Sequence, residues 1–251
     1  MLTRRIIPCL DIAGGQVVKG VQFQNLRAMG DPLELARRHV EGGADELCFL
    51  DVTASVEARP LLLDLIRRLS EVVFVPFTIG GGIRSVDDAR AILRAGADKV
   101  GVNTAAVQRP ELVRELSEEF GAQCIVLSID TCSRGDTWYV TTHGARVVTQ
   151  TPSLEWAQQA VQLGAGEILL NAIDTDGQRD GFSLDITDAI CRAVNVPVIA
   201  SGGAGGPEHF VAVFQQTSVS AALAASIFHD GSWTSNRLKQ VLAEHGIEVR
   251  L

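Results

Sequence analysis

Two aspartates are the residues of this chain best suited to acid–base chemistry. Asp11 ends an apolar run that begins at Arg5, and Asp130 ends another that begins at Gln123. If both runs are strands of one closed parallel barrel, the carboxylates lie on opposite sides of its mouth, where one can donate a proton and the other accept one. A single aspartate at a strand end often only caps a turn or helix. The repeat described below favours the catalytic interpretation.

Two glycine runs predict anion sites. Gly80–Gly82 and Gly202–Gly203 each follow a β-branched run, and their backbone N–H groups can approach a phosphate closely. Asn103–Thr104 and Ala225–Ser226 add polar groups at the ends of neighbouring runs, and Gly177 adds a further backbone donor. A lone glycine pair is usually a tight turn. Two such sites across one mouth predict an extended ligand with a phosphate at each end.

Other charged residues follow the predicted strands. Asp51, Asp174 and Asp176 are acids of the same mouth, and Lys19 lies in a long segment, residues 13–30, that can act as a lid over a bound anion. A solvated lysine would fit the spacing of Lys19 equally well.

Four charged residues stand at the opposite ends of the strands. They are Arg5, Glu46, Lys99 and Glu167, at the start of the first, second, fourth and sixth runs. Two cations and two anions can converge there into a mutually satisfied ring. Such a ring is typical of a stability layer at the bottom of a barrel.

Short β-branched runs alternate with stretches of helical period along the whole chain, which is typical of an α/β barrel. The predicted strands are Arg5–Asp11, Glu46–Asp51, Phe74–Ile79, Lys99–Asn103, Gln123–Asp130, Glu167–Asn171, Val198–Ser201 and Ala221–Ala225. The predicted helices are Pro32–Gly42, Pro60–Val72, Ser85–Ala95, Pro110–Phe120, Leu154–Leu163, Leu184–Val194, Pro207–Gln215 and Trp233–His245. Eight such units predict a single (βα)8 TIM barrel, with an open doubly wound sheet as the alternative.

The two halves of the sequence resemble each other. The segment from Val75 to Gly82 recurs from Val196 to Gly203, 121 residues later. We therefore expect one domain, residues 1–251, made of two half-barrels of roughly residues 1–122 and 123–251. Each chemical feature of one half would then have a counterpart across the mouth.

The composition excludes several classes of protein. Hydrophobic residues make up 46% of the 251 residues, enough for a large core, and the net charge of −8 argues against a generic nucleic-acid or anionic-membrane binder. The five cysteines form no Cys-x-x-Cys pair, so we expect no metal site and a reducing cytoplasm. The N-terminus predicts no signal peptide.

Taken together, the motifs resemble the cyclase subunits of imidazole glycerol phosphate synthase over essentially the whole chain. The motifs that carry the resemblance are Ile7-Pro-Cys-Leu-Asp11, Phe49-Leu-Asp51, Gly80-Gly-Gly-Ile83, Asp98-Lys-Val-Gly-Val-Asn103, Asp174-Thr-Asp176-Gly177, Ala200-Ser-Gly-Gly-Ala-Gly205 and Ala222-Leu-Ala-Ala-Ser226. The resemblance implies a histidine-biosynthesis enzyme without a cofactor. It would join ammonia to a bisphosphorylated ribulosyl aminoimidazole carboxamide nucleotide, giving imidazole glycerol phosphate and aminoimidazole carboxamide ribotide.

The resemblance also implies roles for individual residues. Asp11 and Asp130 would be the acid–base pair, and the ring at the bottom would gate ammonia from a glutaminase subunit that docks on that face, with Asp98 at the interface. The residues implied to bind substrate or phosphate are Lys19, Asp51, Gly81, Gly82, Asn103, Thr104, Asn171, Asp176, Gly177, Ser201, Gly202, Gly203, Ala225 and Ser226.

Three positions depart from the family pattern, namely Gly14, Gly101 and Ser220. None is an expected catalytic residue. Two other functions remain open on the sequence. One is the phosphoribosylformimino isomerase of the same pathway, and the other is a non-catalytic phosphate-binding subunit that activates a glutaminase. Intact Asp11 and Asp130 argue against the second.

Overall fold

The barrel strands form a closed ring. The structure, a computed structural model, describes residues 3–21, 24–52 and 63–251. Within these residues, eight parallel strands pair in the order β1, β4, β5, β6, β7, β10, β11 and β12, and β12 pairs back with β1. Their bounds are β1 Arg5–Ala13, β4 Leu47–Asp51, β5 Phe77–Gly80, β6 Lys99–Val102, β7 Ile125–Arg134, β10 Glu167–Ala172, β11 Val198–Ser201 and β12 Ala221–Ala224. The predicted (βα)8 barrel is confirmed, and the open sheet is wrong.

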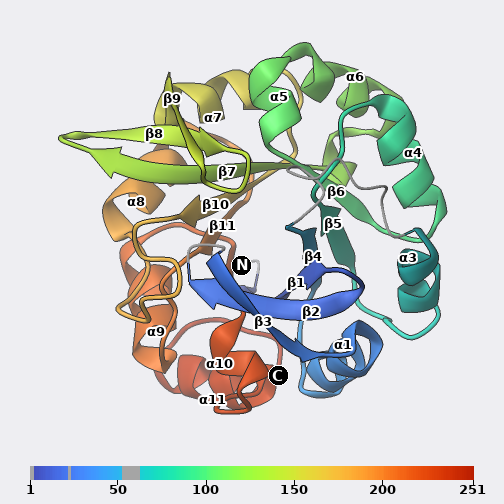
Figure 1. The fold of residues 1–251 in the computed structure, drawn as a ribbon. Helices are drawn as coiled ribbons and strands as arrows, with labels where there is room; N and C mark the ends of the chain where they lie inside the picture. Colours follow the sequence, from blue (N-terminus) through green and yellow to red (C-terminus); the bar gives the residue numbers. More distant parts are fainter. Residues whose placement is uncertain (1–2, 22–23, 53–62) are drawn as a thin grey trace.

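Helices surround this ring (Figure 1). The outer helices are α1 Pro32–Glu41, α3 Leu63–Ser70, α4 Val86–Arg94, α6 Glu111–Phe120, α7 Ser153–Gln162, α8 Leu184–Ala193, α9 Pro207–Gln216 and α11 Ser235–Glu244. Helix α1 shows why they form: Asp31 accepts hydrogen bonds from the N–H groups of Leu33 and Glu34, and Pro32 stands in the first turn. The first residues of the predicted helix 60–72, and residues 53–55 next to Asp51, lie outside the described residues.

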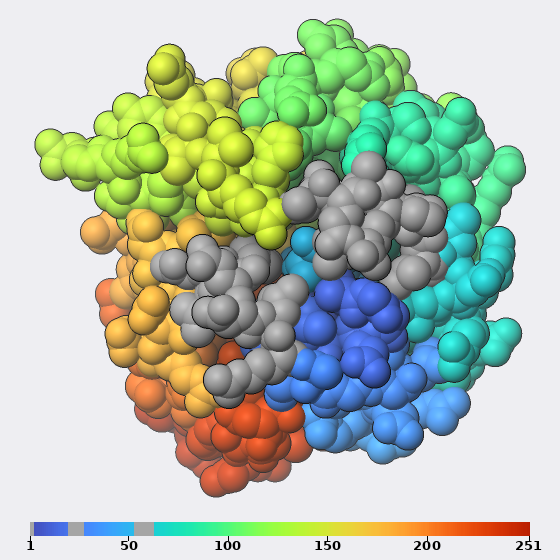
Figure 2. Space-filling model, in the orientation of Figure 1, coloured from blue at the N-terminus to red at the C-terminus, as the bar shows by residue number. Residues whose placement is uncertain are grey.

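Two hairpins and two short helices extend the barrel. β2 Gln16–Val21 and β3 Gln24–Gly30 follow β1, whereas β8 Thr137–Thr142 and β9 Val147–Pro152 follow β7. Helix α5 Thr104–Gln108 follows β6, and α10 Ser226–His229 follows β12. A 3-10 turn, η1 Ala122–Cys124, precedes β7. The hairpins border the mouth on opposite sides: in Figure 2 hairpin β8–β9 is yellow-green, and the part of hairpin β2–β3 that is drawn in colour is blue.

The core has two layers. The larger one lies between the strands and the helices, and includes the fully buried Trp156 and Phe210. The smaller one fills the barrel interior with apolar side chains and two thiols; it consists of Ile7, Cys9, Cys48, Val126, Leu169, Ile199, Ala221, Leu223 and Ala225. Among the described helices, none has the length and apolar character needed to cross a bilayer.

Several predicted strand bounds were wrong. Phe74 does not begin a strand: its side chain is 84% exposed, and β5 begins only at Phe77, whose N–H donates to Asp98 Oδ2 at 2.9 Å. Glu46 precedes β4, and residues 122–124 form the 3-10 turn. No strands were predicted in the segments after β1 and β7, yet their antiparallel pairing makes them hairpins.

Candidate active site

Two cavities open at the carboxyl ends of the barrel strands. One, here the Ser226 cavity, lies over β1, β10, β11 and β12, and the other, the Thr104 cavity, lies over β4, β5 and β6. They are adjoining, because both are lined by Leu50, Ser128, Asp130 and Leu169. An extended ligand can therefore reach from one cavity into the other past Asp130.

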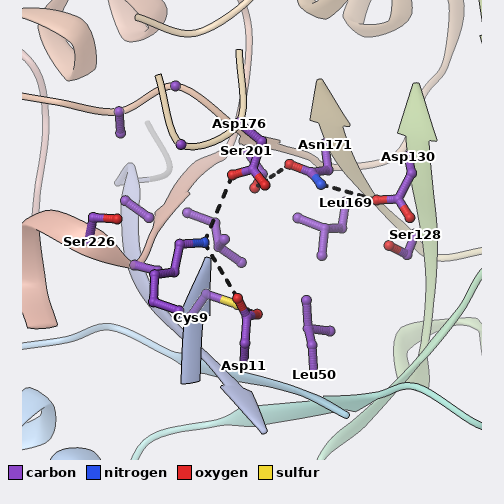
Figure 3. Close-up of a pocket in the computed structure, with 18 of the residues that line it drawn as sticks. Cys9, Asp11, Leu50, Ser128, Asp130, Leu169, Asn171, Asp176, Ser201 and Ser226 are labelled. Atoms are coloured by element: carbon purple, nitrogen blue, oxygen red, sulfur yellow. Dashed lines mark hydrogen bonds and ion pairs between the residues drawn. The ribbon is translucent and has the colours of Figure 1, made fainter. Parts of the chain in front are cut away.

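Asp130 is held by two amides. Asn103 Nδ2 donates to its Oδ2 at 2.9 Å, and Asn171 Nδ2 donates to its Oδ1 at 3.1 Å. Ser201 in turn donates to Asn171 Oδ1 at 3.1 Å, so the three side chains form a continuous line in Figure 3. Burial raises the pKa of Asp130 to about 6, with smaller contributions from the charges of Asp176 and Asp11, while the two amides act in the opposite direction.

Asp11 lies on the other side of the site, at the base of hairpin β2–β3. It is only 3% exposed, and Lys19 Nζ lies 3.4 Å from its Oδ2 and 3.9 Å from Oδ1 of Asp176 (Figure 3). Burial lowers the pKa of Lys19, but these two carboxylates have the larger combined effect and raise it. Burial raises the pKa of Asp176, and Lys19 lowers it. The ammonium of Lys19 therefore bridges two buried acids.

The Thr104 cavity contains the first glycine run. Gly81 has a φ of +94°, and a Cβ there would lie 2.2 Å from the carbonyl oxygen of Asp51. Only glycine fits this close approach. Thr104 begins α5, and its Oγ1 accepts a hydrogen bond from His143 N at 2.9 Å, which joins the turn of hairpin β8–β9 to the cavity. The cavity thus combines backbone N–H groups with a side-chain hydroxyl.

The Ser226 cavity contains the second run. Gly203 has a φ of +96°, and a Cβ there would lie 1.9 Å from the carbonyl oxygen of Gly181. Ser226 begins α10 and faces the same cavity as Gly177, on the side away from Asp130 in Figure 3. The two glycine-lined cavities therefore lie on either side of the acids.

The four charged residues at the other end of the barrel form a closed ring of ion pairs. Arg5 contacts Glu46 at 2.5 Å and Glu167 at 2.6 Å, while Lys99 contacts the same two glutamates at 3.0 and 2.8 Å. Burial lowers the pKa of both cations, but the two glutamates outweigh this effect and raise the pKa of Arg5 and of Lys99. Each glutamate is thus paired with two cations. The ring lies below the apolar interior layer that separates it from Asp11.

The structure gathers all of the predicted substrate and acid–base residues around the two cavities. The Ser226 cavity is lined by Asp11, Lys19, Asp130, Asn171, Asp176, Gly177, Ser201, Gly202, Gly203, Ala225 and Ser226. The Thr104 cavity is lined by Asp51, Gly81, Gly82, Asn103, Thr104 and again Asp130. Asp98 lies elsewhere, immediately before β6, where it accepts the hydrogen bond from Phe77.

Some lining residues had no sequence signal. Leu50, Ser128 and Leu169 are strand residues whose inward orientation follows from the barrel register, and Arg179 lies in the loop after β10. Every second residue of a strand points into the barrel, so this alternation could have identified Leu50, Ser128 and Leu169 once the strand bounds were known. Arg179 could not be found in this way.

Comparison with known proteins adds an independent finding. A family model described as histidine biosynthesis protein matches residues 5–234. The HisF subunit of imidazole glycerol phosphate synthase from Thermococcus onnurineus is 55% identical over 251 residues, which cover 100% of this chain and 99% of that protein. The chain belongs to the HisF family. The same subunit from Solibacter usitatus is 56% identical, and that from Pyrococcus furiosus 54%, again over 100% of this chain.

Membership of the HisF family decides between the functions left open by the sequence. The expected cyclase subunit of imidazole glycerol phosphate synthase is confirmed, and the named relatives favour it over the isomerase. The chain is therefore an enzyme of histidine biosynthesis.

Proposed function

We propose that this HisF chain joins ammonia to the bisphosphorylated ribulosyl aminoimidazole carboxamide nucleotide and releases imidazole glycerol phosphate and aminoimidazole carboxamide ribotide. The observation that carries the proposal is the position of Asp130, which borders both glycine-lined cavities. A ligand with a phosphate in each cavity has its central part beside Asp130. Asp11 lies across the Ser226 cavity from Asp130.

One phosphate binds at Gly81, Gly82 and Thr104, and the other at Gly203 and Ser226. These residues offer neutral N–H and O–H donors that can hold an anion. Lys19 is a cation of the Ser226 cavity, where it already bridges two carboxylates. It closes over the bound substrate and leaves its ion pairs for the substrate's charge.

The reaction requires protons to move in two directions. The nitrogen of ammonia loses its protons as it bonds to the ribulosyl carbonyl carbon, whose oxygen is protonated and leaves as water, and to the carbon that carries the carboxamide ribotide. A proton is supplied to the nitrogen of that departing ribotide. Asp130 exchanges a proton readily near neutral pH, because burial raises its pKa to about 6. Asp11, on the opposite side, serves as its partner, so that each face of the substrate has one carboxyl group.

The chain works within a glutamine amidotransferase complex as its lyase component. A glutaminase subunit docks on the N-terminal face of the barrel, with Asp98 at the interface, and its ammonia enters through the ring of Arg5, Glu46, Lys99 and Glu167. The interior layer beyond the ring is apolar, so it carries neutral ammonia and opposes ammonium. The ring is closed by four ion pairs and must open for ammonia to pass.

The chain forms one domain of two half-barrels, residues 1–122 and 123–251. This is supported by the hairpins after β1 and β7 and by the short helices after β6 and β12, which stand at matching points of the two halves. Each half then supplies one catalytic aspartate and one phosphate site.

Turnover of the bisphosphorylated substrate by the purified chain with an ammonium salt at alkaline pH tests the proposal. We expect imidazole glycerol phosphate from the unsubstituted chain and none from Asp11→Asn or Asp130→Asn, both of which should still bind the substrate. Product formation at the normal rate by either variant would exclude that aspartate from the acid–base pair.

A further inference from the structure

Helix α10 begins at the Ser226 cavity, and its far end is held by helix α1. Arg38 on α1 donates from one guanidinium nitrogen to the carbonyl oxygens of Phe228 and His229, at 3.3 and 3.1 Å. The next residue, His39, places its Nε2 3.1 Å from Nδ1 of His229. Helices α1 and α10 lie side by side in Figure 1. Two consecutive residues of α1 thus contact the C-terminal end of α10.

The imidazole pair is buried and neutral. His39 and His229 are each only 6% exposed. Burial lowers the pKa of His39 to about 3 and that of His229 to about 4, and the charge of Arg38 lowers both pKa values. At His229 the charge of Lys19 also lowers the pKa, whereas Asp11 and the Cys9 carbonyl raise it. In a neutral pair one ring nitrogen donates and the other accepts, so the contact is a directed hydrogen bond. The His39 ring also meets the Phe228 ring edge-on, with centroids 6.3 Å apart.

The C-terminal end of α10 is hydrogen-bonded to a residue that lines the cavity. The N–H groups of Phe228 and His229 both donate to the carbonyl oxygen of Ala225, at 3.1 and 3.0 Å. Ala225 and Ser226 themselves line the cavity. Because α10 is a single short turn, these hydrogen bonds couple the position of His229 directly to that of Ala225 and Ser226.

We propose that Arg38 and His39 are positioning residues for the phosphate site of the Ser226 cavity: they hold α10 so that Ala225 and Ser226 keep the place required to bind the phosphate. The inference rests on the proposed function, because it assumes that a phosphate group of the substrate binds there. Neither side chain lines either cavity, so both act through α10.

The two cavities of one molecule provide the test. Inorganic phosphate is titrated into the 15N-labelled chain, and its Kd is read separately from the amide shifts of Gly203 and Ser226 and from those of Gly82 and Thr104. The variants are Arg38→Met and His39→Phe, the second of which keeps a ring against Phe228. Arg37→Met, an exposed neighbour on α1, is the matched control, and His39→Gln restores a side-chain N–H.

We expect Arg38→Met and His39→Phe to raise the phosphate Kd of the Ser226 cavity about fivefold, the size of one lost hydrogen bond, and to leave the Thr104 cavity unchanged. The KM for the bisphosphorylated substrate should rise by a similar factor, with kcat within about twofold of the original value. His39→Gln should recover most of the loss, and Arg37→Met should change neither cavity.

Equal changes at the two cavities, or no change at either, would overturn the inference, even if the variants unfold at lower temperature. A purely stabilising contact predicts that lower unfolding temperature without selective loss at one cavity. If the unsubstituted chain shows no phosphate-induced shift in either cavity, the proposed phosphate sites are wrong, and the inference is wrong with them.

Discussion

The side-chain amide of Asn171 donates a hydrogen bond to Asp130, with 3.1 Å between Nδ2 and Oδ1. The two residues face each other on adjacent strands, because Asn171 of β10 is in register with Asp130 of β7. This bond lowers the pKa of Asp130 against the larger, opposite effect of burial. Asn171 thus makes it easier for the aspartate to release its proton.

Replacing Asn171 with alanine should therefore move the pH dependence of the enzyme. Loss of the amide removes a group that stabilises the carboxylate, so the pKa of Asp130 rises further above about 6. We expect the corresponding inflection in kcat/KM to move to higher pH by roughly one unit, whether Asp130 acts as acid or base. The pH profile of the ammonia-dependent reaction measures this shift.

Ser201→Ala is the matched control for that shift. Ser201 contacts Asn171 but not Asp130 among the hydrogen bonds of the described residues, so its removal should move the inflection less. The phosphate groups of the substrate titrate identically with every variant and cannot cause a difference. An inflection that stays in place in Asn171→Ala would show that another group controls the profile.

Asp130 should also make the fold less stable at neutral pH. Its pKa in the folded chain, about 6, lies above the usual 3.8, so the folded state binds this proton more tightly than the unfolded state. This loss of folding stability is absent below about pH 4, where Asp130 is protonated in both the folded and the unfolded state. It grows as the pH rises from about 4 to about 6 and is complete above that range. Asp130→Asn should therefore raise the free energy of unfolding by up to about 3 kcal/mol at pH 8.

Chemical denaturation at pH 8 and at pH 4 measures this effect. The gain from Asp130→Asn should be present at pH 8 and largely lost at pH 4. Asp11→Asn serves as control, because it removes an ion-pair partner of Lys19 and should give no gain. Equal effects of Asp130→Asn at the two pH values would contradict the assignment of a burial-raised pKa.

The sequence allowed the fold and most of the site to be predicted for local reasons. The strands carrying Asp11 and Asp130 are β-branched runs, and the glycines that follow β5 and β11 have positions that tolerate no Cβ. The parallel order of a barrel then brings the carboxyl ends of all strands to one face. These features depend on short segments and on a topology with few alternatives.

The features that could not be predicted depend on residues far apart in the chain. The bond from Asn171 to Asp130 requires the register of two strands, and the contact of His39 with His229 joins residues 190 positions apart. The hairpins were missed because their antiparallel pairing carries no clear alternation in residues 13–30 and 131–150. Phe74 was misplaced because an apolar residue before a strand resembles its first residue.

The charged ring should depend on each cation. In Lys99→Met, Arg5 is the one cation of the described residues that still pairs with Glu46 and Glu167. We expect the free energy of unfolding to fall by roughly 2 kcal/mol, less than for a fully isolated buried charge. With the glutaminase present, product formed per glutamine hydrolysed should also fall, whereas turnover with ammonium salt should be kept.

Arg192→Met is the control for Lys99→Met. Arg192 pairs with Asp188 on the surface, with its own side chain 79% exposed, so its loss should leave stability and coupling unchanged. If Lys99→Met keeps full coupling of glutamine to product, the ring is a stability layer rather than a gate.

The second glycine run should be intolerant of a side chain. At Gly203 the left-handed φ of +96° and the close carbonyl of Gly181, 1.9 Å from a Cβ, both oppose alanine. Gly135, in the turn between β7 and β8, has a φ of +63° but nothing within 4 Å of a Cβ. Comparing the two alanine variants thus separates the cost of the backbone conformation from that of the close approach. Gly135→Ala should cost about 1 kcal/mol of stability and leave KM unchanged.

In Gly203→Ala the backbone must shift away from Gly181, which moves its N–H group away from the bound phosphate. We expect KM for the bisphosphorylated substrate to rise at least about tenfold, the loss of one charge-assisted hydrogen bond, while the pH profile set by Asp130 is unchanged. Steady-state kinetics over a pH series measures both quantities in one experiment. A KM equal to that of Gly135→Ala would mean that the loop at Gly203 does not bind phosphate.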